Sequence, residues 1–328
     1  MTLSRLVASA LLTAALLLGG CGMIVDGRAD RREIAAHTRF PPGGAFTRVN
    51  GQRVHYVQRG TGPDLVLIHG ASGNTRDFTY RFLDRLANRY RVTVFDRPGL
   101  GYTDRVSDEF GGPYNTRAES PAEQAAFLAA AAEGLGIEHP IVLGHSYGGT
   151  VALAWGLNHD PAALALLAPA THPWPGGLGW VYDLASSSFG GANVVPLATA
   201  FVGQKQIDTA VRAIFYPQEP PEGYSDYVGA QLTLRRGSFR ANARQVNSLR
   251  PHVVEMSKRY AELDLPVEIV HGTADDIVPL KIHSARLAQD APGATLTKLE
   301  GIGHMVHHVA PDPVEQAIDR AARRAGLR

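Results

Sequence analysis

Short apolar runs alternate along this chain with longer stretches in which apolar residues recur at helical spacing. Runs without polar alternation are typical of parallel strands that are buried on both faces. Such runs, or runs with a single polar residue, predict strands at 65–68, 92–95, 141–143, 163–167 and 267–270, and a more mixed stretch predicts a strand at 294–299. Helical spacing predicts helices at 78–88, 121–133, 150–157, 280–289 and 313–325. The alternation predicts an α/β protein whose mostly parallel sheet has helices on both faces.

Two local signals add detail to this pattern. Residues 46–49 and 53–58 alternate polar and apolar positions around Asn50-Gly51, which predicts a β-hairpin with a two-residue turn. Ser120, Pro121 and Glu123 have the spacing of an N-cap, a first helical proline and a capping-box glutamate. The helix that begins there should therefore be well defined.

Residues 169–263 interrupt the alternation of strands and helices. The segment opens with proline, tryptophan and glycine, continues with weaker helical patterns, and closes with a predicted helix at 245–260, interrupted near Pro251. An insertion at the carboxyl ends of two strands is placed to cover a site there, so we interpret it as a lid, with a decorative insertion as the alternative. The core would then comprise residues 45–168 and 264–328.

Composition narrows the choice of partners. The 328 residues are 45% hydrophobic and 19% charged, which predicts a substantial core. The formal net charge is +1 and no basic block stands out, which argues against nucleic acid as a partner. We interpret Arg28, Arg31 and Arg32 as part of a solvated linker rather than a binding patch.

The N-terminus has the features of a targeting segment. Arg5 precedes an apolar run at 6–18 that is too short for a comfortable membrane span. The following Gly19-Gly20-Cys21 resembles the lipobox of bacterial lipoproteins, and Cys21 is the one cysteine of the chain. We therefore predict a signal peptide at 1–20, lipidation of Cys21, a linker at 21–44 and a membrane-anchored protein in the cell envelope, periplasmic, outer-membrane or on the outer face of the cell membrane. An ordinary secretory signal or an uncleaved anchor is the alternative.

The candidate chemistry centres on Ser146. The apolar strand at 141–143 leads into Gly144-His145-Ser146-Tyr147-Gly148, and a helix follows. This strand, turn and helix form the context of a nucleophile elbow, in which a strained serine is exposed at the carboxyl edge of the sheet. The N-terminus of the following helix would offer N–H groups to a developing oxyanion.

A serine nucleophile needs a base and a group that orients this base. Two later strands lead into loops at the same sheet edge. The first loop contains Asp275 and Asp276, and the second contains His304. These residues are the candidates for the acid and the base.

Five motifs in this order resemble the α/β-hydrolase superfamily, in particular its lidded branch of esterases, cofactor-free perhydrolases, epoxide hydrolases and haloalkane dehalogenases. They are His69-Gly-Ala-Ser72, Asp96-Arg-Pro-Gly-Leu-Gly101, Gly144-His-Ser-Tyr-Gly148, Gly272-Thr-Ala-Asp275 and Gly303-His304. The resemblance runs from about residue 46 to the C-terminus, apart from the lid. It implies an α/β-hydrolase fold with a mainly helical lid after the sixth strand.

The resemblance also assigns roles. It implies that Ser146 is the nucleophile, His304 the general base and Asp275 the orienting carboxylate, with Asp276 as the competitor for that role. The oxyanion hole would consist of the backbone N–H groups of Ala71 and Tyr147. His69, His145, Asp96 and Arg97 are expected to support the loops around the site.

Together these features predict a serine hydrolase that cleaves a small-molecule ester or related acyl substrate through an acyl-enzyme. No cofactor is expected, and the spacing of His304, His307 and His308 matches no strong zinc pattern. Perhydrolysis or C–C bond hydrolysis on the same triad is one alternative, and a non-catalytic envelope protein that binds a ligand is another. Epoxide and haloalkane hydrolysis are disfavoured, because those relatives have aspartate at the elbow. The sequence leaves the oligomeric state open.

Overall fold

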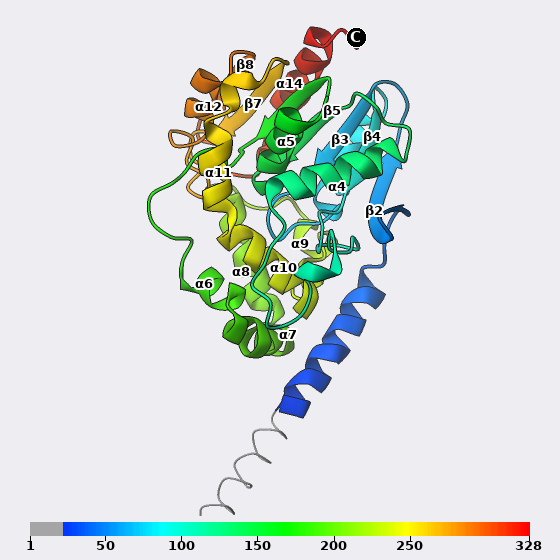
Figure 1. Ribbon diagram of the computed structural model, residues 1–328, viewed down its shortest axis with the longest axis vertical. Helices are drawn as coiled ribbons and strands as arrows, with labels where there is room; N and C mark the ends of the chain where they lie inside the picture. Colours follow the sequence, from blue (N-terminus) through cyan, green and yellow to red (C-terminus); the bar gives the residue numbers. More distant parts are fainter. Residues whose placement is uncertain (1–21) are drawn as a thin grey trace, which may run out of the picture.

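The computed structural model describes residues 22–328, so the predicted signal peptide and Cys21 lie outside the described residues. Its centre is an eight-stranded sheet in the order β1-β2-β4-β3-β5-β6-β7-β8 (Figure 1). The strands are β1 (Ala45–Val49), β2 (Gln52–Arg59), β3 (Asp64–Ile68), β4 (Arg91–Phe95), β5 (Ile141–His145), β6 (Ala163–Leu167), β7 (Val267–Gly272) and β8 (Ala294–Leu299). Every strand predicted from the apolar runs is present.

The strand pairs β1–β2 and β2–β4 are antiparallel. All other neighbouring strands, from β4 through β3 to β8, pair in parallel. The β1–β2 hairpin pairs Val49 with Gln52 and turns at Asn50 and Gly51, both of which have positive φ. A tight turn of this kind requires φ > 0 at both central residues, which confirms the prediction from Asn-Gly. All parallel strands therefore present their carboxyl ends at one edge.

Helices cover both faces of the sheet. The helices α2 (Arg76–Thr79), α3 (Phe82–Leu86) and α14 (Pro311–Arg324) pack on one face, with the short α13 (Val306–Val309) leading into α14. On the other face pack α4 (Pro121–Glu133), α5 (Tyr147–Asn158) and α12 (Ser284–Asp290). This arrangement is the α/β-hydrolase fold that the sequence predicted, and the capping box of α4 is present as expected.

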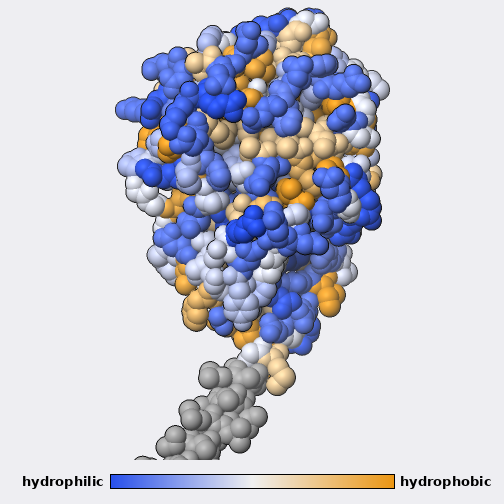
Figure 2. Space-filling view, in the orientation of Figure 1, coloured by the Kyte–Doolittle hydropathy of each residue, from blue (hydrophilic) through white to orange (hydrophobic). Residues whose placement is uncertain are grey.

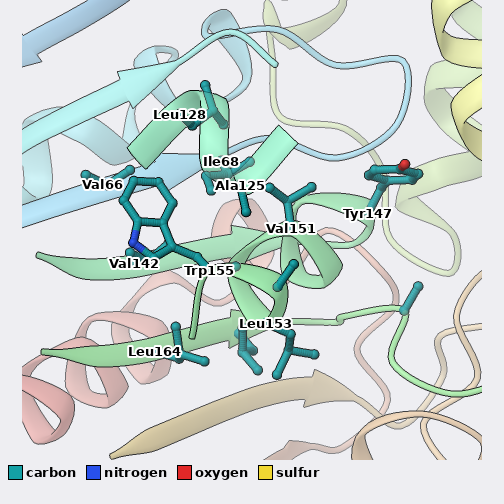
Figure 3. Packing of buried hydrophobic residues seen from close by; sticks show 14 of the residues in the cluster. Val66, Ile68, Ala125, Leu128, Val142, Tyr147, Val151, Leu153, Trp155 and Leu164 are labelled. Carbon is teal, nitrogen blue, oxygen red and sulfur yellow. The ribbon is translucent and has the colours of Figure 1, made fainter. Parts of the chain in front are cut away.

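A core of buried apolar residues lies between α4, α5 and the sheet. Trp155 of α5 lies among Leu128 of α4 and Val66 and Val142 of the central strands (Figure 3). Residues 65–68 of β3 and 141–143 of β5 are all buried but point to alternate faces, into two separate clusters. This is why both strands are continuous apolar runs in the sequence.

Three predicted helices differ from the structure by more than a few residues at their ends or are divided. The stretch predicted at 78–88 is divided into α2 and α3, because Arg81 leaves helical geometry with φ −153°. The predicted helix at 280–289 begins only at Ser284. The predicted helix at 245–260 is two helices that meet at Ser248. Pro251 lies in the first turn of the second helix, where its missing N–H costs little.

The segment between β6 and β7 is helical. It comprises α6 (Trp180–Ser186), a π-helical turn η2 (Gly190–Val194), α7 (Val195–Phe201), α8 (Gln204–Phe215), α9 (Tyr224–Tyr227), α10 (Arg236–Asn247) and α11 (Leu249–Ser257), with 3₁₀ turns at Ala230–Leu232 and Tyr260–Glu262. We call residues 169–263 the cap segment. It lies beyond the carboxyl edge of the sheet (Figure 1).

Residues 22–39 form a helix that packs on the cap segment. Arg28 and Arg32 donate hydrogen bonds to the backbone carbonyls of Ala200 and Val202. The interpretation of these two arginines as parts of a solvated linker is therefore wrong, because they attach the helix to α7. Among the described residues, no helix is both long enough and apolar enough to span a membrane.

Candidate active site

Ser146 lies in a strained turn between β5 and α5. Its backbone has φ 54° and ψ −119°, a conformation that is costly for a residue with a side chain. A Cβ atom on Gly144 would lie 2.1 Å from the carbonyl oxygen of Gly148, and one on Gly148 would lie 2.2 Å from the oxygen of Ile68. Glycine at both positions therefore lets the strand, the turn and α5 approach closely enough to form the elbow.

Asp275 and His304 meet at the carboxyl edge, although they follow different strands. His304 Nδ1 donates to Asp275 Oδ2 over 2.7 Å, and both residues are buried. The other carboxylate oxygen, Oδ1, accepts from the backbone N–H groups of Ile277 and Val278, each at 2.9 Å. Because a carboxylate only accepts, this contact places the proton of neutral His304 on Nδ1 and leaves Nε2 free to act as a base.

A second histidine, His271, holds the same carboxylate. Its Nε2 lies 3.1 Å from Asp275 Oδ2 and 2.8 Å from the carbonyl oxygen of Val278, while its Nδ1 contacts Ser284 Oγ at 2.6 Å. Burial alone would raise the pKa of the Asp275 carboxyl. The hydrogen bonds from His271 and His304 outweigh that effect and hold this pKa below its ordinary value.

Asp276, the competing candidate for the acid, is exposed and makes no hydrogen bond to His304 among the described residues. Ser146 and His304 line the same cavity, and no hydrogen bond joins Ser146 Oγ to the imidazole in this structure. Contacts between a nucleophile and its base are often long before substrate binds. The structure thus brings the three predicted residues to one place, without a hydrogen bond between Ser146 and His304.

The two predicted oxyanion donors flank Ser146. Tyr147 is the first residue of α5, where a backbone N–H has no partner within the helix. Ala71 lines the cavity, and a Cβ atom on Gly70 would lie 3.2 Å from Ser146 Cβ, so the loop passes close to the nucleophile. Neither N–H has a backbone acceptor among the turn and loop hydrogen bonds of residues 22–328.

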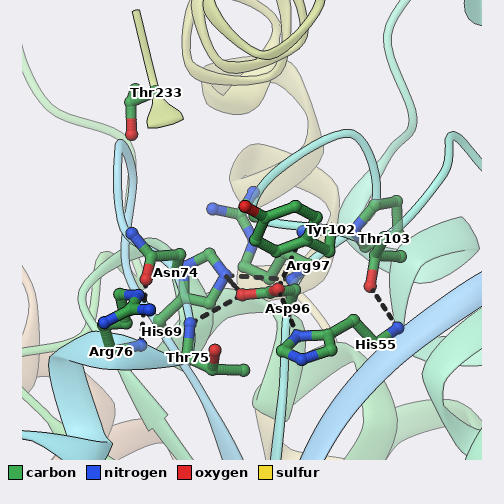
Figure 4. A network of polar contacts seen from close by, with 12 residues as sticks. His55, His69, Asn74, Thr75, Arg76, Asp96, Arg97, Tyr102, Thr103 and Thr233 are labelled. Atoms are coloured by element: carbon green, nitrogen blue, oxygen red, sulfur yellow. Dashed lines mark hydrogen bonds and ion pairs between the residues drawn. The ribbon is translucent and has the colours of Figure 1, made fainter. Parts of the chain in front are cut away.

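Buried polar residues fix the loop that carries Ala71 (Figure 4). The Asp96 carboxylate accepts from His55 Nδ1 (2.7 Å), the Thr75 N–H (2.6 Å) and the Tyr102 N–H (2.8 Å). His69 Nε2 accepts from the Arg97 N–H, and His69 Nδ1 donates to the Gly70 carbonyl, both at 2.9 Å. Burial and the nearby Arg97 charge lower the pKa of His69 to about 4. These contacts are those expected of supporting residues.

Arg97 connects the same loop to the cap segment. It is fully buried and donates to Gly70 O (3.1 Å), Gln124 Oε1 (3.1 Å) and Gln245 Oε1 of α10 (2.8 Å). Its guanidinium carbon lies 3.8 Å from the centre of the Tyr147 ring, which is a cation–π contact. Burial lowers its pKa only to about 10, so the group stays charged at neutral pH.

The cap segment also contacts the loop beyond Ala71. Asn242 of α10 accepts from the Ser72 N–H at 2.6 Å and donates to Ser72 Oγ at 2.9 Å, and Thr233 Oγ1 donates to the Ser72 carbonyl at 2.7 Å. Ser72 has a positive φ of 57°, and these three contacts maintain that conformation. Sequence reasoning missed both Asn242 and His271. A signal existed only for His271, which directly precedes the Gly-x-x-Asp motif.

A cavity of about 410 Å³ opens in front of Ser146 and His304. Most of its wall is apolar and comes from the cap segment and adjoining loops, including Val202, Ile207, Val211, Ile214, Val228, Leu234, Phe239, Ile277 and Met305. Of the aromatic cap residues Trp174, Trp180, Tyr224 and Tyr227, only Tyr224 is among the lining residues. The cavity can hold an apolar group next to the nucleophile.

Histidines also gather behind Ser146. The donor atoms of Asp77, His145 and His307 lie within 4.8 Å of one another, so these buried residues are a candidate metal-binding group. The Asp77 carboxylate, however, already accepts from Tyr224, His307 and His308 at 2.8–3.3 Å. His145 Nε2 donates to the backbone oxygen of His304 at 3.2 Å, which links the elbow to the loop that carries the base.

Comparison with known proteins agrees with this fold. Residues 63–311 match the family model of the alpha/beta hydrolase fold, which covers more than half of the chain. This chain therefore belongs to the alpha/beta hydrolase fold family.

Individual relatives are more distant. An uncharacterized protein of Mycobacterium tuberculosis is 27% identical over 308 residues, covering 88% of this chain and 87% of its own length. Haloalkane dehalogenase 2 of the same organism is 25% identical over 275 residues, covering 81% of this chain and 90% of its own length. The crystal structure of an alpha/beta hydrolase fold protein from Burkholderia ambifaria superposes with a TM-score of 0.67 at 25% identity, covering 84% of this chain and 96% of the other. The family and its hydrolase relatives support a hydrolase.

Proposed function

We propose that this protein is a serine hydrolase that cleaves an ester, or a related acyl compound, with an apolar acyl part. The observation that carries the proposal is the convergence of three groups. Ser146 occupies the strained elbow, His304 shares its cavity, and the His304 Nδ1–H donates to Asp275 at 2.7 Å.

In the proposed reaction, His304 Nε2 takes the proton of the Ser146 hydroxyl as its oxygen attacks the acyl carbonyl. The N–H groups of Ala71 and Tyr147 stabilise the oxyanion, and each such donor is worth roughly a hundredfold or more in rate. The alcohol leaves with the proton from His304. Water then attacks the acyl-enzyme, again with His304 as the base, and releases the acid. Asp275 keeps the His304 proton on Nδ1 throughout.

The apolar wall of the cavity favours a hydrocarbon acyl group over a charged one. Among the described residues, the charged side chains that line it are confined to Asp77, whose carboxylate is already hydrogen-bonded. Serine at the elbow distinguishes this chain from dehalogenase relatives that, as a group, use aspartate there. We therefore place the ester of a hydrophobic acid ahead of a halide or an epoxide as the substrate class.

Labelling with a fluorophosphonate probe tests the nucleophile. We expect the wild-type protein to be modified at Ser146, and the Ser146→Ala variant to remain unlabelled and to lose about a millionfold in kcat. A series of p-nitrophenyl esters of increasing chain length tests the substrate class. A folded wild-type protein that is not labelled at Ser146 would contradict the proposal.

We also propose that Cys21 carries a lipid anchor that holds the hydrolase at the cell envelope. Support comes from the sequence, where the apolar run at 6–18 and the small residues before Cys21 match a lipoprotein signal. Metabolic labelling with an alkyne fatty acid tests this. The wild-type chain should incorporate the label and the Cys21→Ala variant should not.

A further inference from the structure

The outer surface of the cap segment carries large apolar side chains that contact water. We call the surface formed by α6, η2, α7 and the residues beside them the outer cap face. Trp180 is 74% exposed and Phe189 is 68% exposed. The exposed apolar side chains of this face are Leu178, Trp180, Val181, Phe189, Leu197 and Phe201. Such a group of aromatic and aliphatic side chains on one side of a protein indicates an interaction site.

The outer cap face lies at the end of the molecule from which the N-terminal helix projects (Figure 1). Arg28 and Arg32 contact the carbonyls at the end of α7, and the Arg28 guanidinium lies 5.0 Å from the centre of the Phe201 ring. Met23 and Ile24, near the start of the helix, are 74% and 68% exposed. Figure 2 shows apolar residues among polar ones at this end.

Because side-chain contacts attach the helix at residues 22–39 to the cap segment, the orientation of this helix relative to the outer cap face is set by these contacts. Arg236 of α10 pairs with Asp26, Asp30 and Glu33, which recur along one side of the helix. Ala29 and Ala36 of the helix are buried against the protein. Residue 22 precedes Arg28 by six positions, so at about 1.5 Å per residue the helix start extends only about 9 Å beyond its contact with α7.

The chain that precedes residue 22 identifies the occupant of the face. Cys21, the residue proposed to carry the lipid, directly precedes residue 22, which lies at this end of the molecule. Tryptophan and phenylalanine beside basic residues are the side chains that favour a membrane–water interface. Two basic residues, Arg31 of the N-terminal helix and Lys205 shortly after α7, are exposed. A bilayer that holds the acyl chains proposed on Cys21 would therefore lie within reach of the outer cap face.

We propose that the outer cap face docks on the surface of a lipid bilayer. The proposal rests on the membrane attachment proposed for the N-terminal segment and adds a second contact, made by the cap segment itself. Val202, directly after α7, lines the cavity in front of Ser146. Docking would therefore place the apolar wall of the active site beside the membrane, where esters with hydrophobic acyl chains are concentrated.

Quenching of tryptophan fluorescence by brominated phosphatidylcholine tests the contact in the full-length chain. The protein has three tryptophans, of which Trp155 is buried in the core. The full chain is reconstituted in vesicles of phosphatidylcholine and phosphatidylglycerol with or without the brominated lipid. The difference between the wild-type protein and the Trp180→Phe variant isolates the signal of Trp180.

We expect brominated lipid to remove most of the Trp180 signal. The control variant carries Arg323→Trp in addition to Trp180→Phe. Arg323 is exposed near the end of α14, at the opposite end of the molecule from the N-terminal helix. Acrylamide in the water should quench the fluorescence of this added tryptophan, and the brominated lipid should not. A chain that floats with the vesicles but whose Trp180 is not quenched would overturn the docking and leave the attachment standing. Trp180 shielded from both quenchers would show that a second copy covers the face, and this result also overturns the proposal.

Activity gives a second readout. In the variant Trp180→Ser/Phe189→Ser/Leu197→Ser, only exposed side chains change, so the fold should be kept. We expect hydrolysis of an ester embedded in vesicles to fall by about tenfold or more, because three large apolar contacts with the bilayer are lost. Hydrolysis of a water-soluble short-chain ester should stay within about twofold. An equal loss on both substrates, or no loss on either, would contradict the docking.

Discussion

Replacing Asp275 with Asn tests the orientation of His304 with almost no change in shape. The N–H groups of Ile277 and Val278 both donate to Oδ1 at 2.9 Å, so the amide oxygen of Asn must occupy that position. The NH₂ group then takes the place of Oδ2, where it faces the N–H of His304. Two donors cannot satisfy each other. His304 relieves the conflict by moving its proton to Nε2, where it can no longer accept the proton of Ser146.

The expected loss follows from this change of tautomer. We expect kcat of Asp275→Asn to fall by about 10⁴-fold with KM changed little, which corresponds to about 5 kcal/mol in the activation free energy. The assay is hydrolysis of a p-nitrophenyl ester, with circular dichroism and thermal unfolding to show that the variant is folded.

The neighbouring carboxylate provides a matched control. Asp276 is exposed, so Asp276→Asn should keep kcat within about twofold. If folded Asp275→Asn retained more than a tenth of the activity, the proposed role of Asp275 would be refuted. A larger loss in Asp276→Asn than in Asp275→Asn would transfer the role to Asp276.

Four further outcomes are expected. Gly148→Ala should lower the unfolding temperature or prevent folding, because the added Cβ would lie 2.2 Å from Ile68 O. The control Gly237→Ala should not destabilise the protein, because no neighbouring atom lies within 4 Å of a Cβ at that position. Ser120→Ala should cost about 1 kcal/mol of unfolding free energy in urea, through loss of the α4 cap. Val211→Trp should shift the preferred ester towards shorter chains, because Val211 lines the cavity. The free energy of unfolding should fall as pH decreases from about 6.5 to 4, because His69 and His307 bind protons over this range in the unfolded chain but not in the folded protein, where burial lowers the pKa of each to about 4. A urea midpoint that stays constant over this range would contradict this prediction.

Local sequence determined much of the fold because the strands are buried on both faces. Continuous apolar runs such as those of β3 and β5 need no knowledge of their neighbours to be recognised. The Asn50-Gly51 turn and the Ser120 cap are equally local, because each depends on residues a few positions apart. Helix bounds were less predictable, as Arg81 shows, because packing decides where a short helix is interrupted.

The candidate site divides in the same way. Ser146 could be identified from its strand, turn and helix, and the resemblance to a family supplied His304 and Asp275. The role of Asn242 could not be foreseen, because Asn242 contacts Ser72 although the two residues lie 170 positions apart in the chain. Spacing also gave no means of telling that Trp180 lies outside the cavity and Tyr224 lines it.

The sequence by itself determined an α/β sheet, a serine elbow and an apolar segment shortly before Cys21. The tertiary structure decided which carboxylate reaches His304, which cap residues surround Ser146, and that the helix at 22–39 packs on the cap segment. The physical reason is that strands, turns and caps depend on neighbours in the chain. Hydrogen bonds across loops and the exposure of a cap helix depend on how distant segments pack, which periodicity does not encode.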